Sequence, residues 1–318
     1  MKMLKTLAAA VLALGLATAA QAADWPKGPV QLLVPAKAGG GSDLMARIFA
    51  DYLHSKIRVP VVVVNQPAGG GTLAYETVRN ARPDGQTLLF THTGLLVNAH
   101  TGRYAHPVSD FTTIAIGQSY PPQVLAVAPD APWTDLKDFI RDARAHPDRY
   151  SFGVSLGGTS HFIAGQIMDA EDVKLKLVEA ASEVDKVVAL QGGNIDIGNL
   201  SAGAAAQYVQ AGKLKVLAMI DRDPDPAYPA FVPAVQQGVN VTWLAPLVLW
   251  GPKGMDPALV TRINGIVAGM AEDPATRERL AKMSSRFAPL DVAQSRQLVD
   301  EEDAKIARLA ARLGLGRE

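Results

Sequence analysis

The stretch that decides the fold is Val30 to Pro35, VQLLVP, together with the loop Ala38 to Asp43, AGGGSD. An apolar strand runs into three glycines and then into Ser42 and Asp43, two residues that often begin a helix. The pattern predicts a strand, an open loop and a helix from Leu44 to Leu53. Such a corner gathers unpaired backbone N–H groups and the positive end of a helix dipole, so it indicates an anion site.

A second corner of the same kind follows. The strand Val61 to Val64 leads through Asn65 to Ala68 into the glycines Gly69 to Gly71 and Thr72, and a helix is expected from Leu73 to Asn80. We interpret the two corners as facing one small ligand, because each combines a strand end, a glycine loop and a helix N-terminus.

Two more loops follow strands in the same way. The strand Thr87 to Phe90 ends at Thr91-His92-Thr93-Gly94. The strand Ser151 to Ser155 leads into Leu156 to His161, which is rich in glycine and hydroxyl groups. Ligands of open α/β sheets collect at the carboxyl ends of strands, so both loops are expected to line a cleft.

Strands and helices alternate along the chain, which favours an α/β fold with largely parallel sheets. The 318 residues suggest two domains of roughly 100 to 150 residues each. A change of domain is expected at Pro129 to Pro132, and the extended apolar segment Trp243 to Pro252 can return the chain to the first domain. We therefore predict a first lobe of residues 23–128 and 246–318 and a second lobe of residues 129–245.

Several helices carry clear start signals. Thr134 is expected to cap a helix that ends at His146-Pro147, and Ser182 is expected to open another. Asp256 and Pro257 suit the N-cap and first positions of a third helix. The tail from Val292 to Leu313 is a charged amphipathic helix, which is expected to pack across the body of the protein.

The N-terminus has the pattern of a secretory signal peptide. Lys2 and Lys5 precede an apolar run from Leu7 to Ala20, and Ala20-Gln21-Ala22 fits the small-x-small cleavage rule. The predicted signal peptide is residues 1–22, which places the mature protein in the periplasm. A membrane anchor is the alternative, but the run is short for a bilayer span.

The composition is that of a globular protein, with 48% hydrophobic and 19% charged residues. The chain has no cysteine, so it is neither a disulfide-stapled scaffold nor a lipoprotein anchored through a cysteine. Loss of Lys2 and Lys5 would leave 29 basic residues against 31 acidic ones. Nothing in this balance indicates binding to nucleic acid or to an anionic membrane.

In these motifs the chain resembles the substrate-binding proteins of tripartite tricarboxylate transporters, the TctC or Bug family. The resemblance runs from about Trp25 to the C-terminus, and it depends on several weak motifs that occur in order. The motifs are Val34-Pro35 with Ala38 to Asp43, Asn65 to Gly70, Pro83 to Leu88, Gly158 to His161, Gly193 to Asp196 and Gly212 to Leu214.

The resemblance implies a two-lobed fold of the periplasmic-binding-protein type II, with a mostly parallel sheet flanked by helices in each lobe. It also implies an extracytoplasmic solute-binding protein that closes on an organic acid and serves membrane permease subunits. Such a protein is not an enzyme and needs no cofactor. We expect a monomer, because no coiled-coil heptad or apolar seam is visible.

By this resemblance, loops of both lobes hold the ligand, largely through backbone amides and ordered water. The motifs carry that role to Gly39, Gly40, Gly41, Ser42, Ala68, Gly69, Gly70, Thr159, Ser160 and His161. His92, Thr93 and Ser182 complete the set of expected ligand-binding residues. Asp43 is expected to cap its helix or to pair with Arg47, because a carboxylate would repel an anion.

The chain departs from the family at three places, one of which is the segment Asp223 to Val235, where the usual proline- and glutamate-bearing motif is largely absent. An aromatic residue is common after the proline of the first motif, whereas this chain has Ala36 followed by Lys37. The segment after Val178 usually holds a tyrosine, a basic residue and a glycine, whereas here it reads Glu179-Ala180-Ala181-Ser182. These differences indicate a divergent member with an atypical ligand.

Other function classes fit the sequence less well. Gly69-x-Gly71-x-x-Ala74 matches a dinucleotide fingerprint, but the acidic residue expected about 20 positions on is not evident. Gly153 to Gly157 matches the nucleophile elbow of α/β-hydrolases, with Ser155 as the nucleophile. The one histidine after Ser155 is His161, which is too close in sequence to be the distant base of a triad.

The six histidines form no metal-spaced pair, so no metal site is predicted. His92 and His161 can line the cleft or serve as structural hydrogen-bond partners. A sensor protein that presents its ligand to a signalling kinase remains open beside transport, because the sequence of a binding protein does not separate the two.

Overall fold

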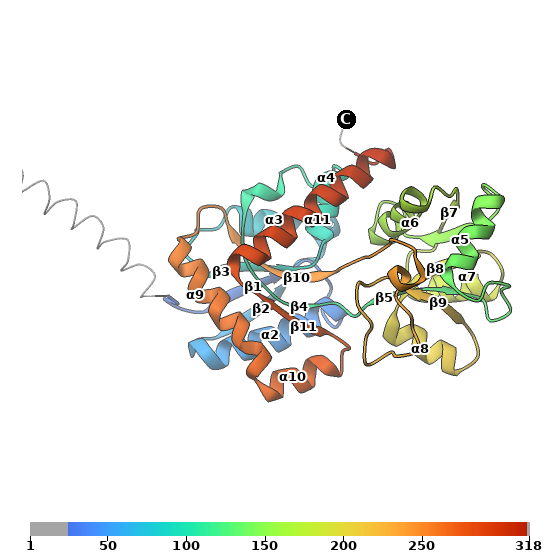
Figure 1. Ribbon diagram of the computed structural model, residues 1–318. Helices are drawn as coiled ribbons and strands as arrows, with labels where there is room; N and C mark the ends of the chain where they lie inside the picture. The colour runs from blue at the N-terminus through green and yellow to red at the C-terminus, as the bar shows by residue number, and fades with distance from the viewer. Residues whose placement is uncertain (1–24, 317–318) are drawn as a thin grey trace, which may run out of the picture.

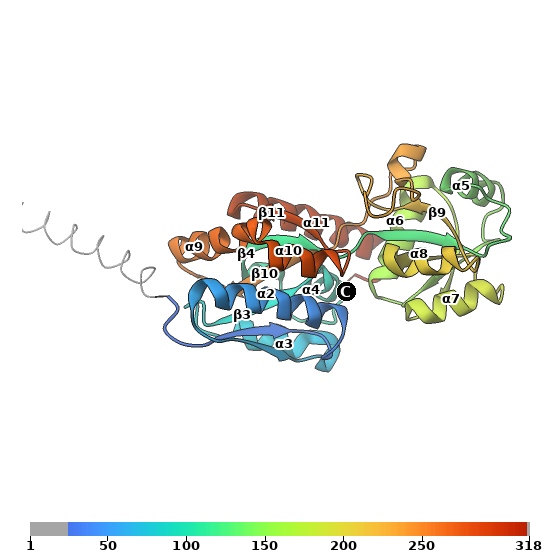
Figure 2. The ribbon, with the colours of Figure 1, turned by 90° about the horizontal axis from the view of Figure 1, so that it is seen from below.

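The computed structural model describes residues 25–316 and divides them between two sheets, each flanked by helices (Figure 1). The predicted signal peptide lies outside the described residues. Two lobes stand side by side, joined by extended segments, in both views (Figures 1 and 2). The prediction of a two-lobed α/β fold is therefore confirmed. No helix of residues 25–316 combines the length and the apolar character that a bilayer span requires.

The sheet of the first lobe has six strands in the order β11-β4-β10-β3-β1-β2. Strands β1, β2 and β3 are parallel, and β10 runs antiparallel to both β3 and β4. The strands are β1 Val30–Val34, β2 Val61–Asn65, β3 Thr87–Thr91, β4 Phe111–Ser119, β10 Pro246–Pro252 and β11 Arg286–Leu290.

Alternating residues of these strands face two separate helix layers, as the two-residue period of a strand requires. Leu32 and Leu88 pack in one cluster with α2 and α9, whereas Leu33 and Leu89 pack in another with α3, α4 and α11. The helices are α2 Gly41–Ile57, α3 Thr72–Arg79, α4 Gly94–His100, α9 Pro257–Ala268, α10 Pro274–Ala281 and α11 Val292–Arg312.

The sheet of the second lobe has five strands in the order β7-β6-β8-β5-β9, with β5 antiparallel to its two neighbours. Helices α5 and α6 cover one face, and α7 and α8 cover the other. The elements are β5 Gln123–Val127, α5 Leu136–Ala145, β6 Ser151–Val154, α6 Thr159–Glu171, β7 Lys176–Glu179, α7 Glu183–Gln191, β8 Ile197–Ser201, α8 Ala202–Gln210 and β9 Lys215–Met219.

The strand–glycine–helix corners form where the pattern predicts them, but four elements were not predicted. These are α4, α8, α10 and β11. The segment Thr91 to Gly94 was predicted as a loop after β3, and α4 begins at its last residue. The predicted cap of α5 is wrong by one residue: Asp135 accepts a hydrogen bond from the Asp138 N–H, and Thr134 instead donates its hydroxyl to the Asp138 carboxylate.

Two segments carry the chain between the lobes, from β4 to β5 and from β9 to β10. They meet where the Tyr120 N–H donates to the Ala245 carbonyl at 2.9 Å. Because β5 belongs to the second sheet, we propose that the first lobe boundary lies between Ser119 and Gln123 rather than at residue 128. The return boundary is proposed between Trp243 and Pro246.

The terminal helix α11 packs across the body, as its pattern predicts. Val299, Ile306 and Leu309 are buried in the cluster that includes core residues of both lobes. Arg312 forms an ion pair with Asp169 of α6 in the second lobe. Helix α11 therefore contacts both lobes.

Asn264 of α9 joins this helix to strands β4 and β11 of the first lobe through buried hydrogen bonds. Its buried side-chain amide donates to the carbonyls of Ile114 and Leu290, both at 3.0 Å. Ile114 is the residue that the β4–β10 register skips between Thr113 and Ala115. We expect Asn264→Ala to lower the free energy of unfolding by about 2 kcal/mol in urea titrations, because two buried carbonyls lose their donor.

The matched control is Asn80→Ala, which removes an exposed hydrogen bond to Glu76. It should change the free energy of unfolding by less than about 0.5 kcal/mol. Equal effects of the two substitutions would contradict the role assigned to Asn264.

Candidate functional site

Two adjoining cavities lie where the corners of the two lobes meet. We call the first, of about 180 Å³, the glycine cavity; it is lined by Pro35, Ala36, Ser42, Gly70, Tyr75, Thr91, His92, Gly94, Val97, Asn98, Arg103, Gly158 and Thr159. We call the second, of about 290 Å³, the lysine cavity; it is lined by His92, Thr93, Tyr120, Gln123, Ser155, Thr159, Ser160, Ala181, Lys186, Asn199, Trp243 and Ala245. They share His92 and Thr159, so together they form one cleft with walls from both lobes.

The helices that begin at the glycine cavity lack side-chain caps. In the part of the chain that the structure describes, no side chain caps α2, α3 or α6, whose N-caps are Gly40, Gly71 and Gly158. By contrast, an aspartate or serine side chain caps each of α5, α7, α9, α10 and α11. The Thr72 and His161 N–H groups donate to backbone carbonyls of their own corners. The other first-turn N–H groups at the cleft have no side-chain cap, so they can donate to a ligand.

Asp43 organises the first corner. Its buried carboxylate accepts hydrogen bonds from the Gly39 N–H and the Arg47 guanidinium, each at 2.9 Å, and from the Asn65 amide at 3.0 Å. The hydrogen bond from Arg47 is the main reason why the pKa of Asp43 is lowered. The expected Asp43–Arg47 pair is confirmed. The carboxylate therefore joins the first corner to the end of β2, and both of its oxygens accept hydrogen bonds from the protein.

The glycines of the first corner and Ser42 are placed differently. Ser42 lines the glycine cavity, and its hydroxyl is hydrogen-bonded to the Tyr120 hydroxyl. Gly39, Gly40 and Gly41 line neither cavity.

The second corner reaches the glycine cavity through Gly70. This residue has φ of +68°, which L side chains rarely adopt, and its carbonyl accepts a hydrogen bond from the Asn98 amide at 3.1 Å. Ala68 and Gly69 lie just before it and line neither cavity. Gly70 is thus the one residue of this motif that borders the cleft.

His92 lies where the two cavities join. Its Nδ1 accepts a hydrogen bond from the Gly94 N–H at 3.1 Å. Its ring packs edge-on against the Tyr120 ring, with 5.3 Å between the ring centroids. Burial lowers the pKa of His92 to about 4, so its imidazole is neutral at pH 7. His92 thus contributes a neutral polar edge to the cleft.

Thr93 is buried beside His92 and lines the lysine cavity. Its hydroxyl has no hydrogen-bond partner among residues 25–316. A buried hydroxyl without a partner is costly, so a ligand atom at this wall would satisfy it.

The hydroxyl-rich corner of the second lobe brings Thr159 and Ser160 to the cleft. Thr159 lines both cavities. Ser160 lines the lysine cavity, where its Oγ accepts a hydrogen bond from the Ser155 N–H at 2.7 Å. His161 lines neither cavity, and its Nδ1 accepts from the Gly157 N–H at 2.9 Å. Ser182 caps α7 through a capping box with Asp185 and lies outside both cavities.

Ser155 does not form the arrangement of a hydrolase nucleophile. It lines the lysine cavity, but no hydrogen bond joins it to a histidine in the described part of the chain. The neighbouring His161 uses its Nδ1 to accept from the loop backbone. Ser155 and the surrounding glycines therefore shape the corner at the end of β6. Among residues 25–316, no group of three or more His, Asp or Glu side chains could hold a metal ion.

The cleft contains residues that the sequence pattern did not indicate. The most prominent are the cations Lys186 and Arg103, with Gln123 and Asn199 beside Lys186. Trp243, at the start of the segment that returns the chain to the first lobe, is buried and also lines the lysine cavity. Neither Lys186 nor Arg103 belongs to a recognisable sequence motif. Only the packing of the two lobes brings their side chains to the cleft.

Arg103 links the two lobes. It lies between α4 and β4 in the first lobe, and its guanidinium donates to the Leu156 carbonyl of the second lobe at 3.1 Å. The same guanidinium packs against Gly157, where a Cβ would come within 2.6 Å of Nη2. Arg103 therefore adds positive charge to the glycine cavity and a direct contact across the cleft.

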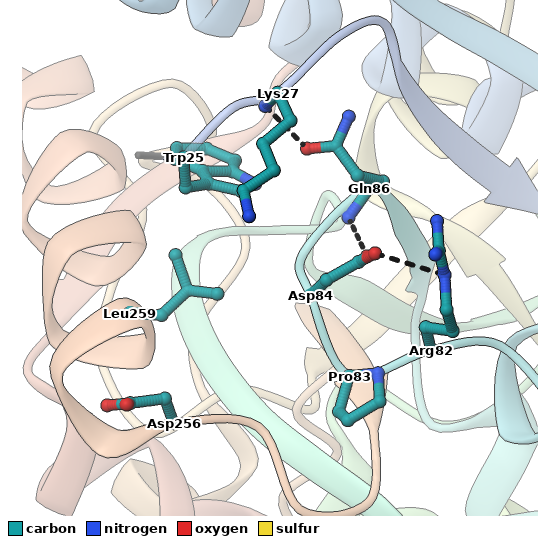
Figure 3. Close-up of a pocket in the computed structure, with 8 residues that line it drawn as sticks. All are labelled: Trp25, Lys27, Arg82, Pro83, Asp84, Gln86, Asp256 and Leu259. Carbon is teal, nitrogen blue, oxygen red and sulfur yellow. Dashed lines mark hydrogen bonds and ion pairs between the residues drawn. The ribbon is translucent and has the colours of Figure 1, made fainter. Parts of the chain in front are cut away.

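A further cavity, of about 330 Å³, lies in the first lobe near Trp25 (Figure 3). Its polar groups bond to one another: Asp84 accepts from the Gln86 N–H at 3.0 Å and pairs with Arg82 at 3.3 Å. Lys27 and Gln86 precede β1 and β3, so this cavity lies at the amino ends of the strands. Because it holds none of the predicted site residues and lies at the opposite edge from the corners, we assign the site to the cleft.

Comparisons with known proteins agree with this architecture. The chain is 28% identical to the "UPF0065 protein in gbd 5′ region" of Cupriavidus necator. The alignment covers 98% of this chain and 96% of that protein. A TctC solute-binding protein from Polaromonas, solved without ligand, superimposes with a TM-score of 0.81 at 24% identity, over 91% of this chain and 99% of that one.

Two structures from Rhodopseudomonas palustris contain ligands. One, described with adipate, has a TM-score of 0.72 at 24% identity and covers 92% of this chain and 99% of that one. The other, MatC with bound malate, has a TM-score of 0.68 at 24% identity, and it covers 90% of this chain and 99% of that one.

The family comparison spans most of the chain. Residues 45–315 match the model of the family described as "Tripartite tricarboxylate transporter family receptor", TctC. The match begins within α2 and includes every later strand and helix of both lobes. The chain therefore belongs to the TctC family of tripartite tricarboxylate transporter receptors.

Proposed function

We propose that this protein is an extracytoplasmic solute-binding protein that captures a small carboxylate in the cleft and delivers it to the membrane subunits of a tripartite transporter. The observation that carries the proposal is the set of uncapped helix N-termini at the glycine cavity. They present N–H groups and positive dipole ends toward one small space, and Arg103 adds a cation there.

The energetics of such a site are sufficient without a buried arginine. Micromolar affinity requires roughly 8 kcal/mol of binding free energy. A hydrogen bond to a charged carboxylate contributes roughly 1.5 to 3 kcal/mol, so several backbone N–H groups supply much of that amount. The cavities of about 180 and 290 Å³ suit a small organic acid.

The ligands of the Rhodopseudomonas palustris proteins support the carboxylate class. Adipate and malate are both small acids, and both proteins share the fold of this chain. The identity of the acid here is a separate question, because the walls of this cleft include Ala36 and Lys186.

The location and partner follow from the family and from the predicted signal peptide. A receptor of a tripartite transporter works outside the cytoplasmic membrane, so the periplasm and permease subunits are the proposed setting. We propose no enzymatic step, since Ser155 lacks a histidine partner in the described residues. Presentation of the ligand to a sensor kinase is the alternative, and copurification with a permease or a kinase would separate the two.

We propose that the lobes close by bending at the two crossing segments. The Tyr120 N–H bond to Ala245 holds these segments together, so they can act as one hinge. Arg103 would then fasten the closed cleft through the Leu156 carbonyl.

A thermal-shift screen of the mature protein tests the function. The panel contains dicarboxylates, tricarboxylates, aromatic acids, amino acids and neutral sugars. A carboxylate at about 100 times its dissociation constant should stabilise the protein by about 2.7 kcal/mol, whereas the neutral sugars should not. Stabilisation by a neutral compound, with none by any acid, would contradict the proposal.

Gly70→Val tests the glycine cavity. Gly70 lines the cavity at a φ of +68°, and a Cβ there would meet no atom within 4 Å, so a valine adds bulk beside the cavity without a clash. We expect carboxylate affinity to fall at least tenfold by isothermal titration calorimetry. Gly212→Val is the matched control, since Gly212 has φ of +66° and similar open space but lines neither cavity. Equal affinities of the two variants would remove Gly70 from the site.

Thr159→Ala tests the wall that both cavities share. Loss of the hydroxyl should weaken carboxylate binding by about 1 kcal/mol, or roughly fivefold. The control Thr261→Ala removes an exposed hydroxyl on α9 and should leave the affinity unchanged. An affinity of Thr159→Ala equal to that of the unmodified protein would exclude the hydroxyl as a ligand contact.

A further inference from the structure

Lys186 is a buried cation without an ion pair. It lies in the first half of α7, its residue is 4% exposed, and it lines the lysine cavity. In the described part of the chain, no ion pair includes Lys186. Buried charges in proteins are usually paired, so the position of this ammonium group calls for an explanation.

The slot for the Lys186 side chain is formed by glycines on two neighbouring strands. A Cβ on Gly153 of β6 would lie 3.5 Å from Lys186 Cγ, and a Cβ on Gly198 of β8 would lie 3.7 Å from Lys186 Cδ. The aliphatic stem therefore passes close over the sheet. The stem carries the ammonium group from α7 to Asn199 at the cavity wall.

Hydrogen bonds fix the polarity of this wall. Lys186 Nζ donates to Asn199 Oδ1 at 2.9 Å, and Asn199 Nδ2 donates to Gln123 Oε1 at 2.8 Å. The side-chain oxygens of Asn199 and Gln123 are the acceptors in these two bonds, so the NH₂ group of Gln123 is left as a donor. Lys186 retains two further N–H donors. All three residues line the lysine cavity, so its wall is rich in donors.

The nearby acids do not neutralise Lys186. Glu183 and Glu179 raise its pKa through their charges, but burial has the larger effect and lowers the pKa to about 8. The Glu183 carboxylate accepts from the N–H and hydroxyl of Ser201, and Glu179 accepts from the Leu156 N–H. At pH 7 the ammonium is still mainly protonated, and its closest partner is the neutral amide of Asn199.

We propose that Lys186, Asn199 and Gln123 form a second anion subsite, which selects ligands that carry two acidic groups over matched monoacids. The inference rests on the proposed function, since the first carboxylate occupies the glycine cavity. The two cavities share His92 and Thr159, so one short ligand can reach both. The second anionic group supplies the counter-charge that Lys186 lacks.

A purely structural role for Lys186 makes a different prediction. If the ammonium only joins α7 to β8, its loss would lower stability and would affect the binding of all acids alike. A subsite predicts a change in the ratio of affinities for a diacid and its matched monoacid. Selectivity is therefore the decisive readout.

The experiment compares adipate with hexanoate, malate with 2-hydroxybutyrate, and phthalate with benzoate by isothermal titration calorimetry. The unmodified protein should prefer at least one diacid to its monoacid by tenfold or more. Lys186→Met keeps the aliphatic stem and removes the charge, so it should reduce that preference at least tenfold while monoacid affinity changes less than twofold. Lys176→Met, at an exposed lysine of β7, is the matched control and should retain the preference.

Asn199→Asp provides a second variant, in case Lys186→Met fails to fold. It places a carboxylate against the ammonium group and gives Lys186 an internal partner. The diacid preference should be lost, and the midpoint of thermal unfolding should not fall.

The outcomes separate the two proposals. If no carboxylate binds the unmodified protein, the proposed function fails and the subsite with it. If carboxylates bind without a diacid preference, or if Lys186→Met and Asn199→Asp leave that preference intact, the subsite is overturned and the proposed function stands.

Discussion

The N–H groups at the start of a helix need acceptors, and this constraint organises the cleft. At α5, α7, α9, α10 and α11 a side chain of the same chain provides the acceptor. At α2, α3 and α6 glycine occupies the N-cap position, and no side chain fulfils that role in the described residues. Helices α4 and α8 also lack a side-chain cap, but among the described α-helices glycine N-caps occur only at α2, α3 and α6, which begin at the glycine cavity. The glycine N-caps and the proposed ligand site therefore belong to one arrangement.

The glycine loops that precede these uncapped helices must still be held in place. Buried polar side chains do this through hydrogen bonds to the loop backbone. Asp43 ties the first loop to Arg47 and to Asn65 at the end of β2. Asn98 of α4 holds the carbonyl of Gly70, and Ser160 holds the N–H of Ser155. These hydrogen bonds fix the loops in the absence of a ligand, which suits a binding site that is formed before the ligand arrives.

The sequence was sufficient for the fold class and for part of the proposed site. A strand, glycines and a helix start repeat at each corner, and this local pattern brought Gly70, His92, Thr93 and Thr159 to the cleft. It did not reveal Lys186, because its burial depends on Gly153 and Gly198, two glycines on strands that lie elsewhere in the sequence. For Ser182 the pattern correctly predicted the start of a helix, but it also suggested a ligand contact. The hydroxyl and the N–H of Ser182 are instead hydrogen-bonded to Asp185 in the helix cap.

The order of the first sheet also governs when the protein can fold. Strand β10, residues 246–252, lies between β3 and β4, which are synthesised long before it. The first lobe therefore cannot close its sheet until most of the chain has left the ribosome, and α11 must still follow to cover one face. Contacts so distant in sequence form slowly. A chain built in this way is expected to fold late, which suits the export across a membrane that we propose.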